Sequence, residues 1–183
     1  VGWVVDVNGA FLLGEFKKGD PEIYMDIPEG MEKWYAHLKG EHVLKLLVPI
    51  YGTKQAARCY FDKAKGVLRK LEYEGSKADP CLFFKWQEKF GLAMCLTWVD
   101  DKLFIAHKDI IKKEKDGLSK YFKCDDVGEL EDYVGCKIEI DRSEKKMIIS
   151  QPVLVQSLFD EFADIEQGRL LLTPAPAGNI LMR

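Results

Sequence analysis

The most constraining feature of the chain is a pair of adjacent acids, Asp100 and Asp101, between two short apolar stretches, residues 92–99 and 103–106. This pattern predicts a strand, a tight turn and a returning strand. A two-residue hairpin turn favours Asn-Gly or Asp-Gly because its central residues need positive φ, so Asp-Asp suits the turn poorly. The carboxylates therefore suggest a purpose other than turn formation, and we expect them to bind a divalent metal ion.

Length and composition favour one globular domain. The chain has 183 residues, 47% of them hydrophobic, which is enough for a sizeable core. A net charge of -3 argues against wholesale coating of nucleic acid but permits a local basic face. The five cysteines occur singly and the three histidines stand apart from them, which favours reduced thiols in an intracellular protein over a zinc site. No apolar run approaches the roughly 20 residues of a membrane span, so no membrane partner is expected.

The periodicity of apolar residues predicts an α+β fold, a mostly antiparallel sheet with helices packed on one face. Strands are expected at residues 1–7, 22–27, 42–49, 81–86, 92–99, 103–106, 130–140 and 146–149. Helices are expected at residues 53–73 with Thr53 as N-cap, at 109–122, and from Ser150 as cap through 162. Residues 31–41 are expected to form an irregular connection.

The first of these helices carries a basic face. Its polar side bears one acid, Asp62, and an excess of cations, namely Lys54, Arg58, Lys63, Lys65, Arg69 and Lys70. A solvated surface is the ordinary interpretation of such a face. Binding of nucleic-acid phosphates is the alternative.

A third carboxylate, Asp6, ends the first predicted strand just before Asn8-Gly9. If the strands that carry Asp6, Asp100 and Asp101 are neighbours in one antiparallel sheet, the three acids converge. They would then raise one another's pKa unless hard cations neutralised them. Two magnesium ions about 4 Å apart would support nucleotidyl transfer. A turn former for Asp6 and a solvated surface for the acidic pair remain the alternatives.

Short motifs in a fixed order connect these acids to a known family. They lie at residues 6–12, 22–25, 28–30, 51–58, 76–82, 99–101, 126–130, 133–135 and 173–174. Together they resemble the reverse transcriptase of copia-type LTR retrotransposons over nearly the whole chain. The resemblance implies a polymerase palm over residues 1–165 and a linker or tail over residues 166–183. It also implies fingers strands before Val1, and thumb and ribonuclease H regions after Arg183.

The resemblance implies catalytic roles for four residues. Asp6, Asp100 and Asp101 would hold two Mg²⁺ ions, with Mn²⁺ as an alternative, which agrees with the hypothesis from the residues themselves. Lys123 lies in the late-palm region and would protonate the leaving pyrophosphate, although a surface lysine is an almost equal alternative.

Two further residues would contact the incoming nucleotide. Phe11 would pack under its sugar and clash with a 2′-hydroxyl, which selects deoxynucleotides; plain core packing is the alternative. Gln55 would contact the nucleotide or the template, with a hydrogen bond at the helix N-terminus as the alternative.

Nucleic-acid contacts are implied for a third group. Trp98, where the family usually has Tyr, would lie under the primer terminus. Gly135 would belong to the turn that supports the primer strand, where glycine permits close backbone approach. The template and primer phosphates would be bound by residues of the basic helix, Lys54, Arg58 and Lys65.

These observations favour an RNA-directed DNA polymerase that acts with the rest of its polyprotein on an RNA template, a DNA primer and dNTPs, in a cytoplasmic particle or the nucleus. The alternative is an inactive or domesticated fragment that keeps the palm fold to bind nucleic acid or protein. Trp98, and Ala57 where the family usually has Pro, favour that alternative. A nuclease is a weaker alternative, because the Ala10-Phe11 gate would have no purpose in one.

Overall fold

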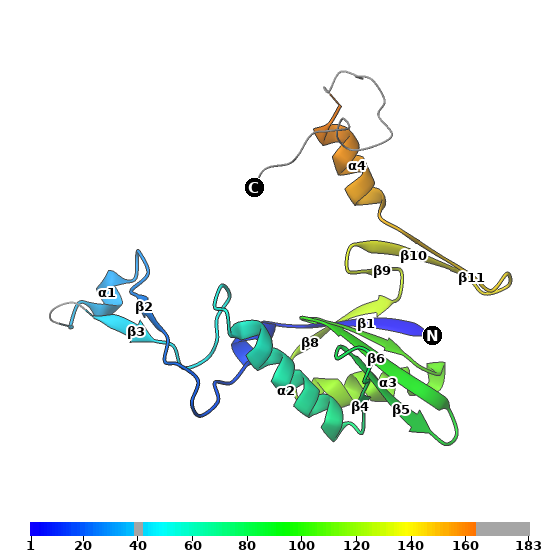
Figure 1. Ribbon diagram of the computed structural model, residues 1–183, viewed down its shortest axis with the longest axis horizontal. Coiled ribbons are helices and arrows are strands. Elements are labelled where there is room, and N and C mark those ends of the chain that lie inside the picture. Colours follow the sequence, from blue (N-terminus) through cyan, green and yellow to red (C-terminus); the bar gives the residue numbers. More distant parts are fainter. Residues whose placement is uncertain (39–41, 164–183) are drawn as a thin grey trace, which may run out of the picture. The chain divides into compact units, whose positions relative to one another are not determined.

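A computed structural model describes residues 1–38 and 42–163 of the chain (Figure 1). The chain divides into two units, Val1–Val134 and Gly135–Arg183. The predicted boundary at residue 165, the tail 166–183 and the motif at residues 173–174 lie outside the described residues.

The first unit is built on a six-stranded antiparallel sheet with the strand order β4-β5-β6-β7-β1-β8. Alternating burial along these strands shows that one face is packed and the other is open. The strands are β1 (Gly2–Val7), β4 (Glu74–Gly75), β5 (Leu82–Gln87), β6 (Gly91–Trp98), β7 (Asp101–Ile105) and β8 (Cys124–Glu129). Only β4 and β8 were not expected from the sequence. The unit ends with β9 (Asp132–Tyr133).

Two helices, α2 (Ala56–Lys70) and α3 (Lys108–Ser119), cover the same face of this sheet (Figure 1). The apolar side of each helix joins one buried cluster with the inward side chains of the strands, for example Leu68 of α2, Leu118 of α3 and Phe104 of β7. A short 3₁₀ helix, η1 (Ala10–Leu13), follows β1. The structure confirms an α+β fold with helices on one face of an antiparallel sheet.

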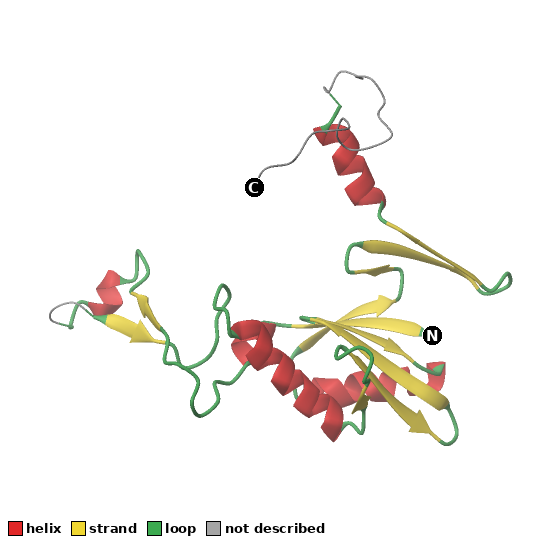
Figure 2. Ribbon diagram, viewed as in Figure 1, coloured by secondary structure: helices red, strands yellow, loops and turns green. Residues whose placement is uncertain are grey.

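A second, two-stranded sheet pairs β2 (Tyr24–Asp26) with β3 (Val43–Lys45). Both strands are shorter than the sequence suggested. Within residues 31–41, where an irregular connection was expected, α1 (Glu32–Tyr35) forms one helical turn (Figure 2). A helix this short has too few side chains for a 3.6-residue period to stand out.

The described part of the second unit contains the hairpin of β10 (Cys136–Asp141) and β11 (Lys146–Ser150), followed by α4 (Pro152–Glu161). The hairpin and the helix were expected. Ser150, however, ends β11, and Gln151 occupies the N-cap position, so the assignment of Ser150 as cap was wrong.

The start of α2 also differs from the prediction. The helix begins at Ala56, and the Thr53 hydroxyl donates a hydrogen bond to the Ile50 carbonyl (2.8 Å) instead of capping the helix. All five cysteines are free thiols, as expected. Among the described helices, none is long and apolar enough to cross a membrane.

Candidate active site

The β6–β7 hairpin carries the acidic pair, but its turn is placed one residue earlier than expected. Trp98 pairs with Asp101, so the two central residues of the turn are Val99 and Asp100. The prediction that both acids occupy the turn was therefore wrong, and Asp101 is the first residue of β7. Val99 takes a positive φ of 47°. A β-branched residue in this region is strained by about 1–3 kcal/mol.

Antiparallel register aligns four side chains in one row across the sheet. Trp98 on β6 lies opposite Asp101 on β7, Asp101 lies opposite Asp6 on β1, and Asp6 lies opposite Asp125 on β8. Directly opposed residues share a face of the sheet. Because the next residues in these strands, such as Val5 and Lys102, point into the core under α2 and α3, the row lies on the open face.

The backbone of Asp100 is hydrogen-bonded to β1 beside Asp6. Its carbonyl oxygen accepts a hydrogen bond from the amide of Val7 (3.0 Å), the residue that follows Asp6. The condition for the acids to converge, that the strand of Asp6 and the hairpin of Asp100 and Asp101 are neighbours, is thus met.

Burial and charge act together on two of these acids. Partial burial raises the pKa of Asp6, and the charges of Asp100 and Asp125 raise it further. Partial burial likewise raises the pKa of Asp101, with added repulsion from Asp100 and Asp6. The pKa values of both acids are thus raised, with burial as the first cause and neighbouring acids as the second. Within the described residues, no group of three acidic, histidine or cysteine side chains is already arranged to hold a metal ion.

A cation lies directly behind the acids. The side chain of Lys102 is fully buried, and its Nζ donates hydrogen bonds to the carbonyl oxygens of Val99 (2.5 Å), Asp100 (3.3 Å) and Asp101 (3.4 Å). Nζ also lies 5.1 Å from the centroid of the Tyr60 ring. Burial lowers the pKa of Lys102 to about 8, which leaves the amine mainly protonated at neutral pH.

The two predicted aromatic site residues line one apolar cavity of about 200 Å³. Phe11 on η1 and Trp98 at the end of β6 contribute to its wall, together with Tyr60 and Lys102. Phe11 also packs against Tyr51, with ring centroids 4.8 Å apart. Trp98 is 57% exposed, so much of its indole is accessible to a ligand.

Three other predicted site residues are not members of this row. Gln55 is the N-cap residue of α2 without a side-chain cap hydrogen bond, which excludes the predicted alternative role at the helix N-terminus. The side chain of Lys123 is exposed, while its carbonyl accepts the Asn8 amide (3.0 Å). Gly135, in the second unit, has a φ of 72°, and a Cβ there would meet nothing within 4 Å. Among the described residues its backbone conformation, and not close packing, explains the glycine.

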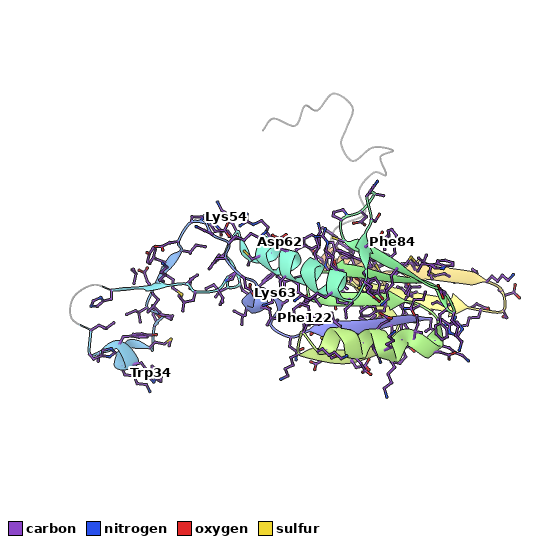
Figure 3. The ribbon with its side chains drawn as sticks, turned by 90° about the horizontal axis from the view of Figure 1, so that it is seen from below. Trp34, Lys54, Asp62, Lys63, Phe84 and Phe122 are labelled. Carbon is purple, nitrogen blue, oxygen red and sulfur yellow. The ribbon has the colours of Figure 1, made fainter. Side chains whose placement is uncertain are left out.

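Ion pairs occupy part of the basic helix. Arg58 binds Asp20 (2.7 Å) and Lys63 binds Glu15 (2.6 Å), while Asp62 on α2 pairs with Lys17. Figure 3 shows Lys54 beside the start of α2, with Asp62 and Lys63 along the helix. Lys54 is exposed and Lys65 is half-buried. Arg58 would have to leave Asp20 before it could bind a phosphate.

The sequence interpretation missed three residues at this site. Asp125 was hidden because β8 has no apolar alternation that would predict a strand. Tyr51 belongs to a recognised motif but had no assigned role. Lys102 lies between the acids and the apolar stretch 103–106. A lysine at an inward position of a strand is unusual, and this signal could have identified it.

An antiparallel sheet with two helices on one face, and acids from three adjacent strands on the other, is consistent with the palm of a nucleic-acid polymerase. The family described as reverse transcriptase (RNA-dependent DNA polymerase) matches residues 2–173. No solved structure matches the chain significantly.

Curated relatives give the same result. The chain is 33% identical over 171 residues to the retrovirus-related Pol polyprotein from transposon TNT 1-94 of Nicotiana tabacum, covering 93% of this chain and 12% of the relative. It is 30% identical over 148 residues to the polyproteins from transposons RE1 and RE2 of Arabidopsis thaliana, covering 80% of this chain and 10% of each relative. The chain thus spans about a tenth of these relatives and belongs to the reverse transcriptase family.

Proposed function

We propose that this chain is the palm of an RNA-directed DNA polymerase that extends a DNA primer on an RNA template. The observation that carries the proposal is the register of Asp101 with Asp6, together with the hydrogen bond from the Val7 amide to the Asp100 carbonyl. This register brings the side chains of Asp6 and Asp101, from two neighbouring strands, together on the open face of the sheet.

Carboxylate oxygens are the ligands that Mg²⁺ prefers, so the donor set of Asp6, Asp100 and Asp101 suits this ion, with Mn²⁺ as a substitute. The raised pKa values of Asp6 and Asp101 indicate local negative charge that a bound cation would relieve. Bound metal ions would supply charge neutralisation of the attacking and leaving oxygens in phosphoryl transfer.

The remaining roles belong to the chain itself. Phe11, supported by Tyr51, is placed by the proposal under the sugar of the incoming dNTP, where its ring would exclude a 2′-hydroxyl. The exposed indole of Trp98 would contact the primer terminus. Gln55 would contact the nucleotide or template, and Lys123 would donate a proton to pyrophosphate. The partners would be the RNA template, the DNA primer and the other regions of a Pol polyprotein.

Primer extension on an RNA template with Mg²⁺ tests this function in a full-length polyprotein that contains the chain. Asp100→Asn should reduce incorporation by at least 10³-fold, because a positioned charge acting on the transition state is lost. Asp116→Asn is the matched control, since Asp116 is exposed on α3, on the other side of the sheet. No extension by the unaltered protein would favour the binding-only alternative. Equal extension by Asp100→Asn would reject Asp100 as a metal ligand.

A further inference from the structure

Lys102 has a position that the proposed chemistry does not explain. It follows the two acids directly in β7, yet its side chain points to the opposite face of the sheet, into the core. A fully buried lysine is costly unless its charge has partners. Its ammonium donates hydrogen bonds to the carbonyl oxygens of the three residues that precede it, Val99, Asp100 and Asp101.

These partners match the donor capacity of the side chain. An ammonium group has three donors in a compact arrangement, and backbone carbonyl oxygens are strong acceptors. The shortest of the three bonds goes to Val99, the residue whose backbone is strained by its positive φ. The ammonium thus binds the turn at the point where the backbone is least stable by itself.

The same carbonyl links the turn to the neighbouring strand. The carbonyl oxygen of Asp100 accepts hydrogen bonds from the Lys102 ammonium, on the core side of the sheet, and from the Val7 amide of β1. The carboxylates of Asp6 and Asp101 also experience the Lys102 charge, which partly offsets the effect of burial and mutual repulsion. Lys102 therefore acts on the conformation of the turn and on the electrostatic environment of Asp6 and Asp101.

We propose that Lys102 is a positioning residue: its buried ammonium holds the carbonyl oxygens of the turn and so fixes Asp100 and Asp101 against β1. The inference deepens the proposed function, because the position of these acids matters for catalysis only if they carry out the polymerase chemistry. The local effect on the turn does not depend on that function.

Hydrogen exchange in the 183-residue chain tests the local effect. Lys102→Met keeps a similar side-chain volume and removes the ammonium. We expect the Val7 amide, which is bonded to the Asp100 carbonyl, to exchange at least tenfold faster. The amides of Thr97 and Ala106, bonded to the carbonyls of Cys81 and Val1, should change less than twofold.

The matched control removes a second, partly buried lysine of the sheet. Lys85 pairs with Glu114 (2.7 Å), so Lys85→Met is combined with Glu114→Gln to avoid leaving a buried charge unpaired. This double variant should alter exchange across the sheet without selecting Val7. Unchanged exchange at Val7 in Lys102→Met, or a uniform increase at all three amides, would overturn the proposal. If Lys102→Met does not fold, Lys102→Gln, which keeps a shorter donor, should give an intermediate and still selective increase.

The catalytic consequence is measured by primer extension with the full-length polyprotein. Lys102→Met should lower kcat about tenfold and change KM for the dNTP by a smaller factor, because the turn with its acid moves while Phe11, on η1, keeps its place. A normal kcat with selectively fast exchange would reject the catalytic consequence. Absence of extension by the unaltered protein would reject the proposed function, while the exchange experiment would still decide the role of Lys102.

Discussion

Charged side chains have different surroundings in two regions of the six-stranded sheet. Near β5, Glu114 of α3 is 2% exposed and accepts hydrogen bonds from Tyr73 (2.9 Å) and Gln87 (3.0 Å) in addition to its ion pair with Lys85. At the β7–β1–β8 end, Asp101, Asp6 and Asp125 lie in one row on the open face. The charge of Glu114 is neutralised by Lys85 inside the fold, whereas the acids of the row repel one another.

This difference separates a structural charge cluster from the proposed metal site. Every oxygen of Glu114 has a partner, so its charge is stable without any ligand. The pKa values of Asp6 and Asp101 are raised by partial burial and by neighbouring acids, and under the proposed function a bound cation would relieve this repulsion. The repulsion between these acids lowers the stability of the folded chain, which is a common cost at a binding site.

The largest effect is expected at the paired end. Glu114→Ala leaves the Lys85 ammonium, which is 11% exposed, without its carboxylate, and should lower the free energy of unfolding by about 3–5 kcal/mol. Urea denaturation measures this change. The double variant Glu114→Leu with Lys85→Met should recover most of the loss, because an apolar pair leaves no buried charge. A loss below about 1 kcal/mol in Glu114→Ala would mean that the pair contributes little.

A smaller effect of opposite sign is expected at the acidic end. Asp6→Asn removes one of the repelling charges and should raise the free energy of unfolding in metal-free buffer by about 0.5–1 kcal/mol. Addition of Mg²⁺ should stabilise the unaltered chain more than the variant, since ligand binding stabilises the folded state. Thermal unfolding with and without Mg²⁺ measures both changes. Asp116→Asn, as control, should keep the full response to Mg²⁺, and an equal response in Asp6→Asn would contradict the metal assignment.

The smallest effect is expected for the ion pair between the exposed Arg58 and Asp20. Arg58→Ala should leave the free energy of unfolding nearly unchanged, because solvent screens the guanidinium charge. In RNA binding, Lys54→Ala should reduce the slope of log K against log salt by about one, as expected for one lost phosphate contact. Arg58→Ala should reduce it less, since Arg58 already binds Asp20. Unchanged slopes in both variants would identify this face as a solvated surface.

Much of the candidate site could be predicted from the sequence. The apolar stretches around Asp100 and Asp101 indicated the hairpin, and Asp6 at a strand end indicated the third acid. The exact turn could not be predicted, because Val99 with a positive φ violates the local preference that a sequence pattern expresses. It is tolerated in a structure where the Lys102 ammonium binds its carbonyl.

Asp125 and Lys102 escaped prediction for a common reason. Each is significant only through neighbours that are distant in the sequence or on the opposite face of the sheet. Asp125 gains its place because β8 pairs with β1 in a register that includes a shift between Val4 and Val5. No local pattern specifies which strands become neighbours.

The sequence by itself determined most of the elements of this protein, the presence of an acidic hairpin and membership of the reverse transcriptase family, because apolar periodicity and short motifs are local properties of a chain. Tertiary structure alone decided which acids face one another and that a buried lysine holds the turn between them. Strand register and burial arise from long-range packing, which fixes the distances on which electrostatics depends.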